Sequence, residues 1–144
     1  MNKAIVSMLL LGLITVAACK KSEDPAPQAV DFQLTEARLN GQPVVPLPAY
    51  TITLRFDAEG IPTDYEATGS HPAAPALDQQ GTWQQDGTQI TFTSGNGSGT
   101  RTVQVSGAQV DALSSQIELS WSLSKTEIDW EKVGDYTYSF TRME

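Results

Sequence analysis

The sequence predicts an all-β domain, an antiparallel up-and-down barrel of eight strands, with a β-sandwich as the alternative. First, apolar side chains occupy every second position in several short stretches, such as 50–56, and this is the period of a half-buried strand. Second, Gly, Asn, Asp and Pro mark turns between these stretches. Third, helical periodicity is almost absent. Short consecutive strands leave exposed edges unless the sheet closes or folds over, so a barrel or a sandwich is expected.

Each expected strand is identified by its alternation. The first runs through 32–39, and the pattern is weak there, in 63–67 and in 82–83. The other seven strands are centred on 50–56, 63–67, 82–83, 90–92, 103–105, 117–123 and 136–140. The clearest hairpin lies at Asp86-Gly87, because a type I′ turn needs positive φ at both of its central residues. A single short helix is expected over 126–133, ending before Gly134.

The apolar members of these stretches are expected to face inward as the core: Tyr50, Ile52, Leu54, Phe56, Trp83, Ile90, Phe92, Ile117, Leu119, Trp121, Leu123, Tyr136, Tyr138 and Phe140. An eight-stranded barrel is wide enough either to be filled by such side chains or to hold one small ligand. Large aromatic residues favour filling, whereas tyrosines, whose hydroxyls need partners when buried, are compatible with a partly polar cavity. Both interpretations stay open at this point.

The N-terminal segment has the organisation of a secretory signal. Lys3 is the one charged residue before Cys19, and it precedes a run from Ala4 to Ala18 without charge. Such a run is short for a membrane-spanning helix, which needs roughly 20 residues. The run ends in Val16-Ala17-Ala18-Cys19, and Cys19 is the only cysteine of the chain. One interpretation is an ordinary cleaved signal followed by an unrelated cysteine.

The segment Val16-Ala17-Ala18-Cys19 also resembles the lipobox of bacterial lipoproteins. This resemblance implies cleavage before Cys19, a diacylglycerol on its sulfur and usually a third acyl chain, such as palmitate, on its amine. Residues 1–18 are then a signal peptide, 19–30 the lipidated cysteine with a polar, proline-containing tether, and 31–144 the β domain. In lipoproteins of many gram-negative bacteria an Asp after the cysteine retains the protein at the inner membrane. Lys20 stands there in this chain, so the resemblance implies the outer membrane, on its periplasmic or its surface face.

The charge of the chain excludes some partners. Of its 9 basic and 17 acidic side chains only Lys3 precedes Cys19, so the part from Cys19 onward has a formal net charge of 8 minus 17, or −9. Such a surface is repelled by phosphate backbones, and nucleic acid is therefore not expected as a partner. The expected membrane contact is the acyl chains, since two or three of them hold a protein at a bilayer stably.

Three stretches of the domain resemble the lipocalin-like domains of small bacterial lipoproteins. They are Leu54-Arg-Phe56-Asp-Ala-Glu-Gly60, Gly81-Thr-Trp83 with the following Asp86 to Phe92, and Tyr136-Thr-Tyr138-Ser-Phe140. The chain departs from that family in its first strand, which lacks the frequent Gly-x-Trp. The resemblance implies a barrel able to hold a small apolar or amphipathic ligand. The residues expected to contact such a ligand are Tyr50, Leu54, Trp83, Trp121, Trp130 and Tyr138.

The order of the strands, counted as odd or even along the chain, predicts where a site could lie. In an up-and-down barrel the connections after the first, third, fifth and seventh strands share one end. These connections are the long ones, 40–49, 70–77, 94–99 and 125–134, and the tether joins the opposite end. We therefore expect an elaborate mouth that faces away from the membrane.

The residue inventory argues against an enzyme, a metal site and a bound cofactor. His71 is the only histidine and Cys19 is expected to be acylated, so zinc ligands and Cys-His chemistry are not expected. The carboxylates Asp64 and Glu66 share one strand face and remain the candidate for acid-base chemistry. Besides ligand binding, the alternative function is that of a structural or protein-interaction module with a filled barrel, whose protein partner the sequence does not identify.

Overall fold

The computed structural model describes residues 26–69, 73–97, 99–106, 109–123 and 134–144, with the backbone alone for 121–123. These residues form strands and no helix, so none of them makes a helix able to cross a membrane. The strands are β1 Gln28–Leu39, β2 Gln42–Pro43, β3 Thr51–Phe56, β4 Pro62–Thr68, β5 Gln80–Asp86, β6 Gln89–Ser94, β7 Thr100–Ser106, β8 Gln116–Leu123 and β9 Gly134–Arg142. The signal peptide, Cys19, His71, Trp130 and the expected helix over 126–133 lie outside the described residues.

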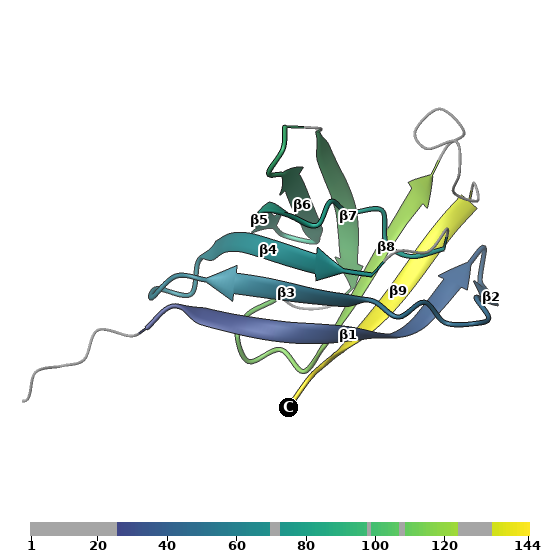
Figure 1. Ribbon diagram of the computed structural model, residues 1–144, viewed down its shortest axis with the longest axis horizontal. Helices are drawn as coiled ribbons and strands as arrows, with labels where there is room; N and C mark the ends of the chain where they lie inside the picture. The colour runs from purple at the N-terminus through teal and green to yellow at the C-terminus, as the bar shows by residue number, and fades with distance from the viewer. Residues whose placement is uncertain (1–25, 70–72, 98, 107–108, 124–133) are drawn as a thin grey trace, which may run out of the picture.

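The sheet is a closed barrel, as the alternation of the sequence predicts. Its strand order is β2-β1-β3-β4-β5-β6-β7-β8-β9, all neighbours are antiparallel, and β1 also pairs with β9 (Figure 1). Eight strands close the barrel, and β2 is an additional two-residue strand beside the end of β1. The β1–β9 pairing distinguishes this barrel from the sandwich alternative, because closure leaves no pair of separate sheets.

Strand β1 is longer than the sequence pattern predicts because a bulge divides it. The register with β9 shifts between Leu34 and Glu36, and the inward positions change from even numbers, ending at Leu34, to odd numbers, beginning at Ala37. This change of parity explains why alternation was weak over 32–39. The strand also begins at Gln28, so residues expected in the tether join the barrel, and Val30 is buried.

The barrel interior is packed with apolar side chains. Every predicted core residue whose side chain is described is buried. Aromatic rings meet edge to face, with ring centroids 5.3 Å apart for Phe56 and Trp83 and 5.0 Å apart for Tyr65 and Phe92. Such pairs add stability beyond their buried area.

The two ends of the barrel differ as strand parity predicts. At one end, here called the loop end, lie the connections 40–50, 69–79 and 95–99 and the start of β9. Neighbouring connections touch there: the Asp135 N–H donates to the Asn40 side chain (2.9 Å), and the Gly95 N–H donates to the Gln80 carbonyl (2.9 Å). The opposite end, the turn end, has the connections 57–61 and 87–88 and the residues 109–115. Strand β1 begins at the turn end, since Gln28 pairs with Phe56.

Gly81 of β5 has no room for a side chain. A Cβ atom there would overlap the Thr93 carbonyl oxygen and lie 2.8 Å from a ring carbon of Tyr65. We therefore expect Gly81→Ala to lower the free energy of unfolding by about 1 to 3 kcal/mol, the usual cost of overpacking. Urea denaturation followed by circular dichroism measures this. Thr82→Ser, on the exposed face of the same strand, is the control and should stay within about 0.5 kcal/mol of the parent; equal stability of the two variants would contradict the prediction.

Candidate functional site

The loop end of the barrel is covered by the connection between β4 and β5. Ala73, Ala74 and Pro75 of this connection are buried, although they belong to no strand. The hydroxyl of Tyr138 on β9 donates a hydrogen bond to the Ala73 carbonyl oxygen, 2.9 Å away. We call residues 73–75 the cap. Its side chains are small, so the part of the loop end that the structure describes is covered here by two alanines and a proline.

Tyrosines lie beneath the cap. The rings of Tyr136 and Tyr138 are stacked, with centroids 5.6 Å apart and an interplanar angle of 7°, and Tyr50 meets Phe140 edge to face at 6.4 Å. All four rings are buried. Because three of them carry hydroxyls, this end of the interior has polar groups among its aromatic rings.

A further buried tyrosine, Tyr65 of β4, packs toward β5 and β6. It lies across Gly81, and its ring meets Phe92. Burial raises the pKa of the Tyr65 hydroxyl, and the negative charge of Asp78, in the connection that carries the cap, raises this pKa further. The hydroxyl therefore stays protonated at neutral pH, and a carboxylate lies close to the interior at the loop end.

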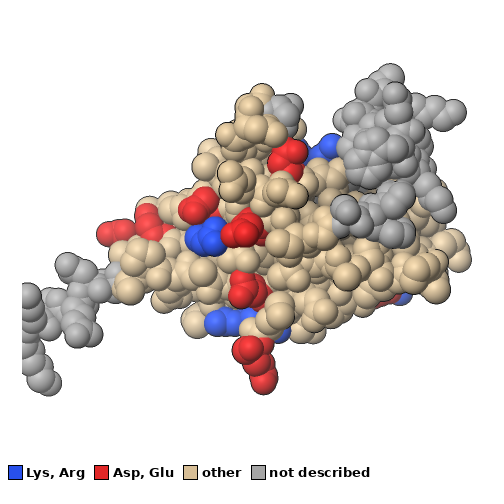
Figure 2. All heavy atoms as spheres, in the orientation of Figure 1, with Lys and Arg blue, Asp and Glu red and all other residues tan. Residues whose placement is uncertain are grey.

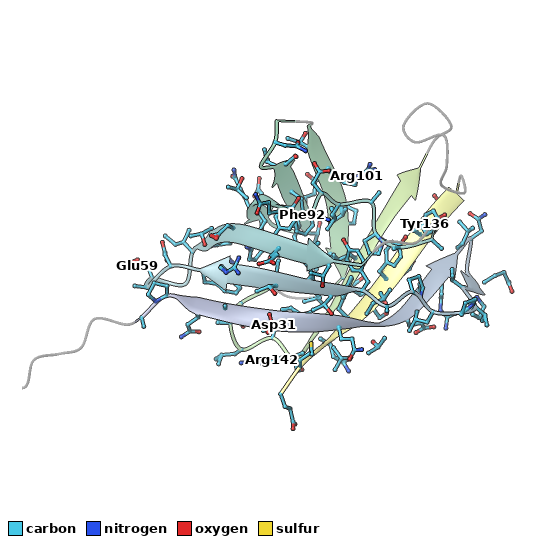
Figure 3. All side chains as sticks on the ribbon, viewed as in Figure 1. Asp31, Glu59, Phe92, Arg101, Tyr136 and Arg142 are labelled. Atoms are coloured by element: carbon cyan, nitrogen blue, oxygen red, sulfur yellow. The ribbon has the colours of Figure 1, made fainter. Side chains whose placement is uncertain are left out.

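Arg101 of β7 is on the inner face of the barrel. It is directly opposite Phe92 of β6 in the register, and opposite residues of an antiparallel pair share a face. Phe92 is buried, and Arg101 is partly buried. Figure 3 shows Phe92 and Arg101 on the hairpin of β6 and β7, with Tyr136 across from them on β9.

The pairing of β7 with β8 stops before it reaches Arg101. Strands β7 and β8 pair only through Gln104, Val105 and Ser106, whereas β8 and β9 pair along the whole of β8. In Figure 1, β7 and β8 diverge from these pairs toward the loop end. Arg101 is therefore in a part of β7 that has no hydrogen-bonded pairing with β8.

The turn end is closed by larger groups. The Trp83 indole N–H donates to the Arg55 carbonyl oxygen (3.2 Å), and the ring packs on Phe56. From the connection between β7 and β8, Val110 is buried, and its N–H donates to the Gln85 side-chain oxygen (2.9 Å). A ligand at this end would have to displace an indole ring.

The residues expected to bind a ligand fall into three groups. Tyr50 and Tyr138 lie at the loop end, near the cap. Leu54 and Trp83 belong to the packed middle and turn-end part of the interior, where both are buried. Trp121 is in β8, paired with Tyr136, but its side chain is not described, and Trp130 lies outside the described residues. Ligand contact by these residues stays a prediction.

A shallow groove of about 380 Å³ lies outside the barrel at the turn end. Its lining combines the apolar residues Val105, Val110 and Ile117 with several Ser and Gln residues. The carboxylate of Asp111 already accepts bonds from the Leu113 N–H (2.8 Å) and the Ser114 hydroxyl (3.3 Å). The side chains of Asp111 and Ser114 are therefore hydrogen-bonded within the turn that forms this part of the groove.

The carboxylates considered for acid-base chemistry lie on the outer face of the barrel. Arg55 of β3 contacts both, at 3.8 Å from Asp64 and 3.1 Å from Glu66, and Figure 2 shows these charges gathered over β3 and β4. Surface ion pairs of this kind contribute little to stability. Among the described ranges, no three His, Cys, Asp or Glu side chains are grouped to hold a metal ion.

Comparison of the chain with protein-family models, curated proteins and solved structures gave no match. The functional residues therefore have to be identified from the chain's own geometry. The sequence pattern missed Arg101, although the alternation of Val103 and Val105 extends to it and places it on the inner face. It also missed the cap, since two alanines in a proline-containing connection carry no signal of burial.

Proposed function

We propose that this protein is a lipid-anchored envelope protein that binds a small amphipathic molecule at the loop end of its barrel. The observation that supports this most directly is the cap, where small side chains cover a cluster of tyrosines. The anchor is the acylated Cys19, as the resemblance of Val16 to Cys19 to a lipobox implies.

The cap is the part of the interior that a ligand displaces at the lowest cost. Each alanine of the cap buries about one methyl group, worth about 0.8 kcal/mol. The hydrogen bond from the Tyr138 hydroxyl to the Ala73 carbonyl contributes about 1 kcal/mol. Removing an aromatic ring from the packed middle costs about 3 to 5 kcal/mol. A molecule with an apolar part therefore enters beside Ala73 and Ala74 and meets tyrosine hydroxyls there.

The anchor orients this end away from the bilayer. The ten residues from Cys19 to Gln28 span about 30 Å when extended, and β1 begins at the turn end. The loop end then faces the aqueous side of the membrane, where it can receive a molecule from solution.

The NMR signals of the alanine methyl groups test the proposal, because alanines at the two ends of the barrel can be compared in one titration. The full chain in phosphatidylcholine nanodiscs is titrated with 1-octanol, an uncharged probe, against empty nanodiscs. We expect saturable shifts of the Ala67, Ala73 and Ala74 methyl resonances and none of Ala112, which lies at the turn end and serves as the control. Absence of saturable binding, or shifts confined to Ala112, would contradict the proposal.

The packing of the interior favours a second candidate, a structural or protein-interaction module with a filled barrel. Among the described residues, eight aromatic side chains are fully buried: Trp83, Tyr65, Tyr136, Tyr138, Phe32, Phe56, Phe92 and Phe140. A barrel without any response to octanol would support this candidate.

A further inference from the structure

Arg101 breaks the pattern of its own strand. On β7 the inner positions Val103 and Val105 are buried and apolar, and the next inner position toward the loop end carries a guanidinium. A partly buried cation is unfavourable unless an anion or acceptors compensate it. Sequences depart from local rules of this kind mainly at functional sites.

The other described arginines have partners within the protein. Arg38 contacts Glu36 at 2.6 Å, Arg55 contacts Asp64 and Glu66, and Arg142 donates to the Ala112 carbonyl oxygen at 2.6 Å. For Arg101 no ion pair or side-chain hydrogen bond is found among the residues that the structure describes. Its five N–H donors are thus available to a bound group.

The backbone of β7 adds donors on the same side. The Gly99 carbonyl accepts from the Ser94 N–H of β6, and the Val105 N–H donates to the Thr88 carbonyl just before β6. Bonding direction alternates along an antiparallel strand. The N–H and C=O groups of Thr100 and Thr102 therefore point away from β6, toward the part where β7 and β8 diverge. An anion there can meet both the Arg101 guanidinium and a backbone N–H.

Apolar groups lie next to these donors. Phe92 is opposite Arg101, and the Tyr65 ring packs on Phe92 with centroids 5.0 Å apart. Asp78, whose charge acts on Tyr65, belongs to the connection that carries the cap. A charged head at Arg101 and an apolar part near Phe92 together describe an amphipathic anion. Arginine binds carboxylate and phosphate through paired, parallel hydrogen bonds.

We infer that Arg101 binds the carboxylate or phosphate of an amphipathic molecule, whose apolar part lies along Phe92 toward the cap. This inference rests on the proposed function and names the chemical class of its ligand. Asp78, whose charge reaches Tyr65, places a like charge at the same end of the barrel and weakens the site.

The experiment uses calorimetry on the full chain in phosphatidylcholine nanodiscs. The probes are octanoate, octyl phosphate, 1-octanol and inorganic phosphate. We expect Arg101→Gln to weaken octanoate and octyl phosphate binding about tenfold or more, the size typical of one lost charged contact, and to leave 1-octanol unchanged. Arg101→Lys should retain part of the affinity, and Asp78→Asn should increase it by roughly twofold.

Arg55→Gln is the matched control, because it removes the same charge from the outer face and should bind octanoate like the parent. If octanoate and 1-octanol bind the parent but Arg101→Gln binds octanoate equally well, the anion site is overturned while the proposed function stands. If octanoate, octyl phosphate and 1-octanol all fail to bind the parent, the proposed function fails as well. Equal affinity for inorganic phosphate and octyl phosphate would overturn the amphipathic assignment and identify a free phosphate site. Circular dichroism of each variant verifies that it is folded.

Discussion

Replacing Trp83 by alanine should lower the free energy of unfolding by about 3 to 5 kcal/mol, a large part of the total for a domain of this size. Trp83 is 1% exposed and is the largest of the fully buried side chains that the structure describes. Trp83 follows Thr82, which with Asp64 forms the last pair between β4 and β5. Its indole N–H donates a hydrogen bond to the Arg55 carbonyl, where the register of β3 with β4 shifts. Alanine would leave a cavity and an acceptor without its donor.

Urea denaturation of the mature chain, followed by far-ultraviolet circular dichroism, measures this loss. Trp83→Phe keeps an aromatic ring but not the N–H, so it should lower the free energy of unfolding less than Trp83→Ala does. Gln84→Ala, on the exposed face of the same strand, should change stability by about 0.5 kcal/mol or less. A Trp83→Ala protein as stable as the Gln84→Ala control would show that the turn end is not closed by packing.

Replacing Cys19 by serine should move the protein from the membrane fraction to the soluble fraction. Serine has no thiol to carry the diacylglycerol that the lipobox resemblance implies. Each buried methylene of an acyl chain contributes about 0.8 kcal/mol, so loss of two or three chains removes essentially all membrane affinity. The acidic chain, with a net charge of −8, offers anionic lipid no compensating attraction.

Fractionation with immunodetection follows this change, and mass spectrometry of the N-terminal peptide identifies the acyl chains directly. Ser22→Ala is the neighbouring control and should stay with the membrane. Retention in washed membranes of a Cys19→Ser protein from which residues 1–18 have been cleaved, or an unmodified Cys19 in the parent, would contradict the lipid anchor.

Much of the fold could be predicted because alternation is a local property. Each of the stretches 50–56, 90–92 and 136–140 shows its inward residues at a spacing of two, and all of their described apolar members are buried. Connection lengths then indicated which end carries the long loops. The failure of alternation over 32–39 was informative as well, since a bulge between Leu34 and Glu36 shifts the inward positions.

The candidate site was predictable only in part. Tyr50 and Tyr138 were expected near a ligand from their residue type and strand positions, and they lie at the loop end. The proposed roles of Arg101 and the cap depend on contacts between distant segments, such as the bond from Tyr138 to Ala73. No short-range pattern encodes a contact of that sequence separation.

By itself, the sequence determined which residues face inward, which end of the barrel carries the long connections, and that Cys19 is the expected anchor. These properties depend on side-chain period, turn chemistry and a local motif. Only the tertiary structure decided that β1 closes the barrel against β9, that alanines cap the loop end, and that β7 separates from β8 beside Arg101. Closure joins strands about a hundred residues apart, and the pairing that results depends on how bulges and side-chain volumes fit together in the whole barrel.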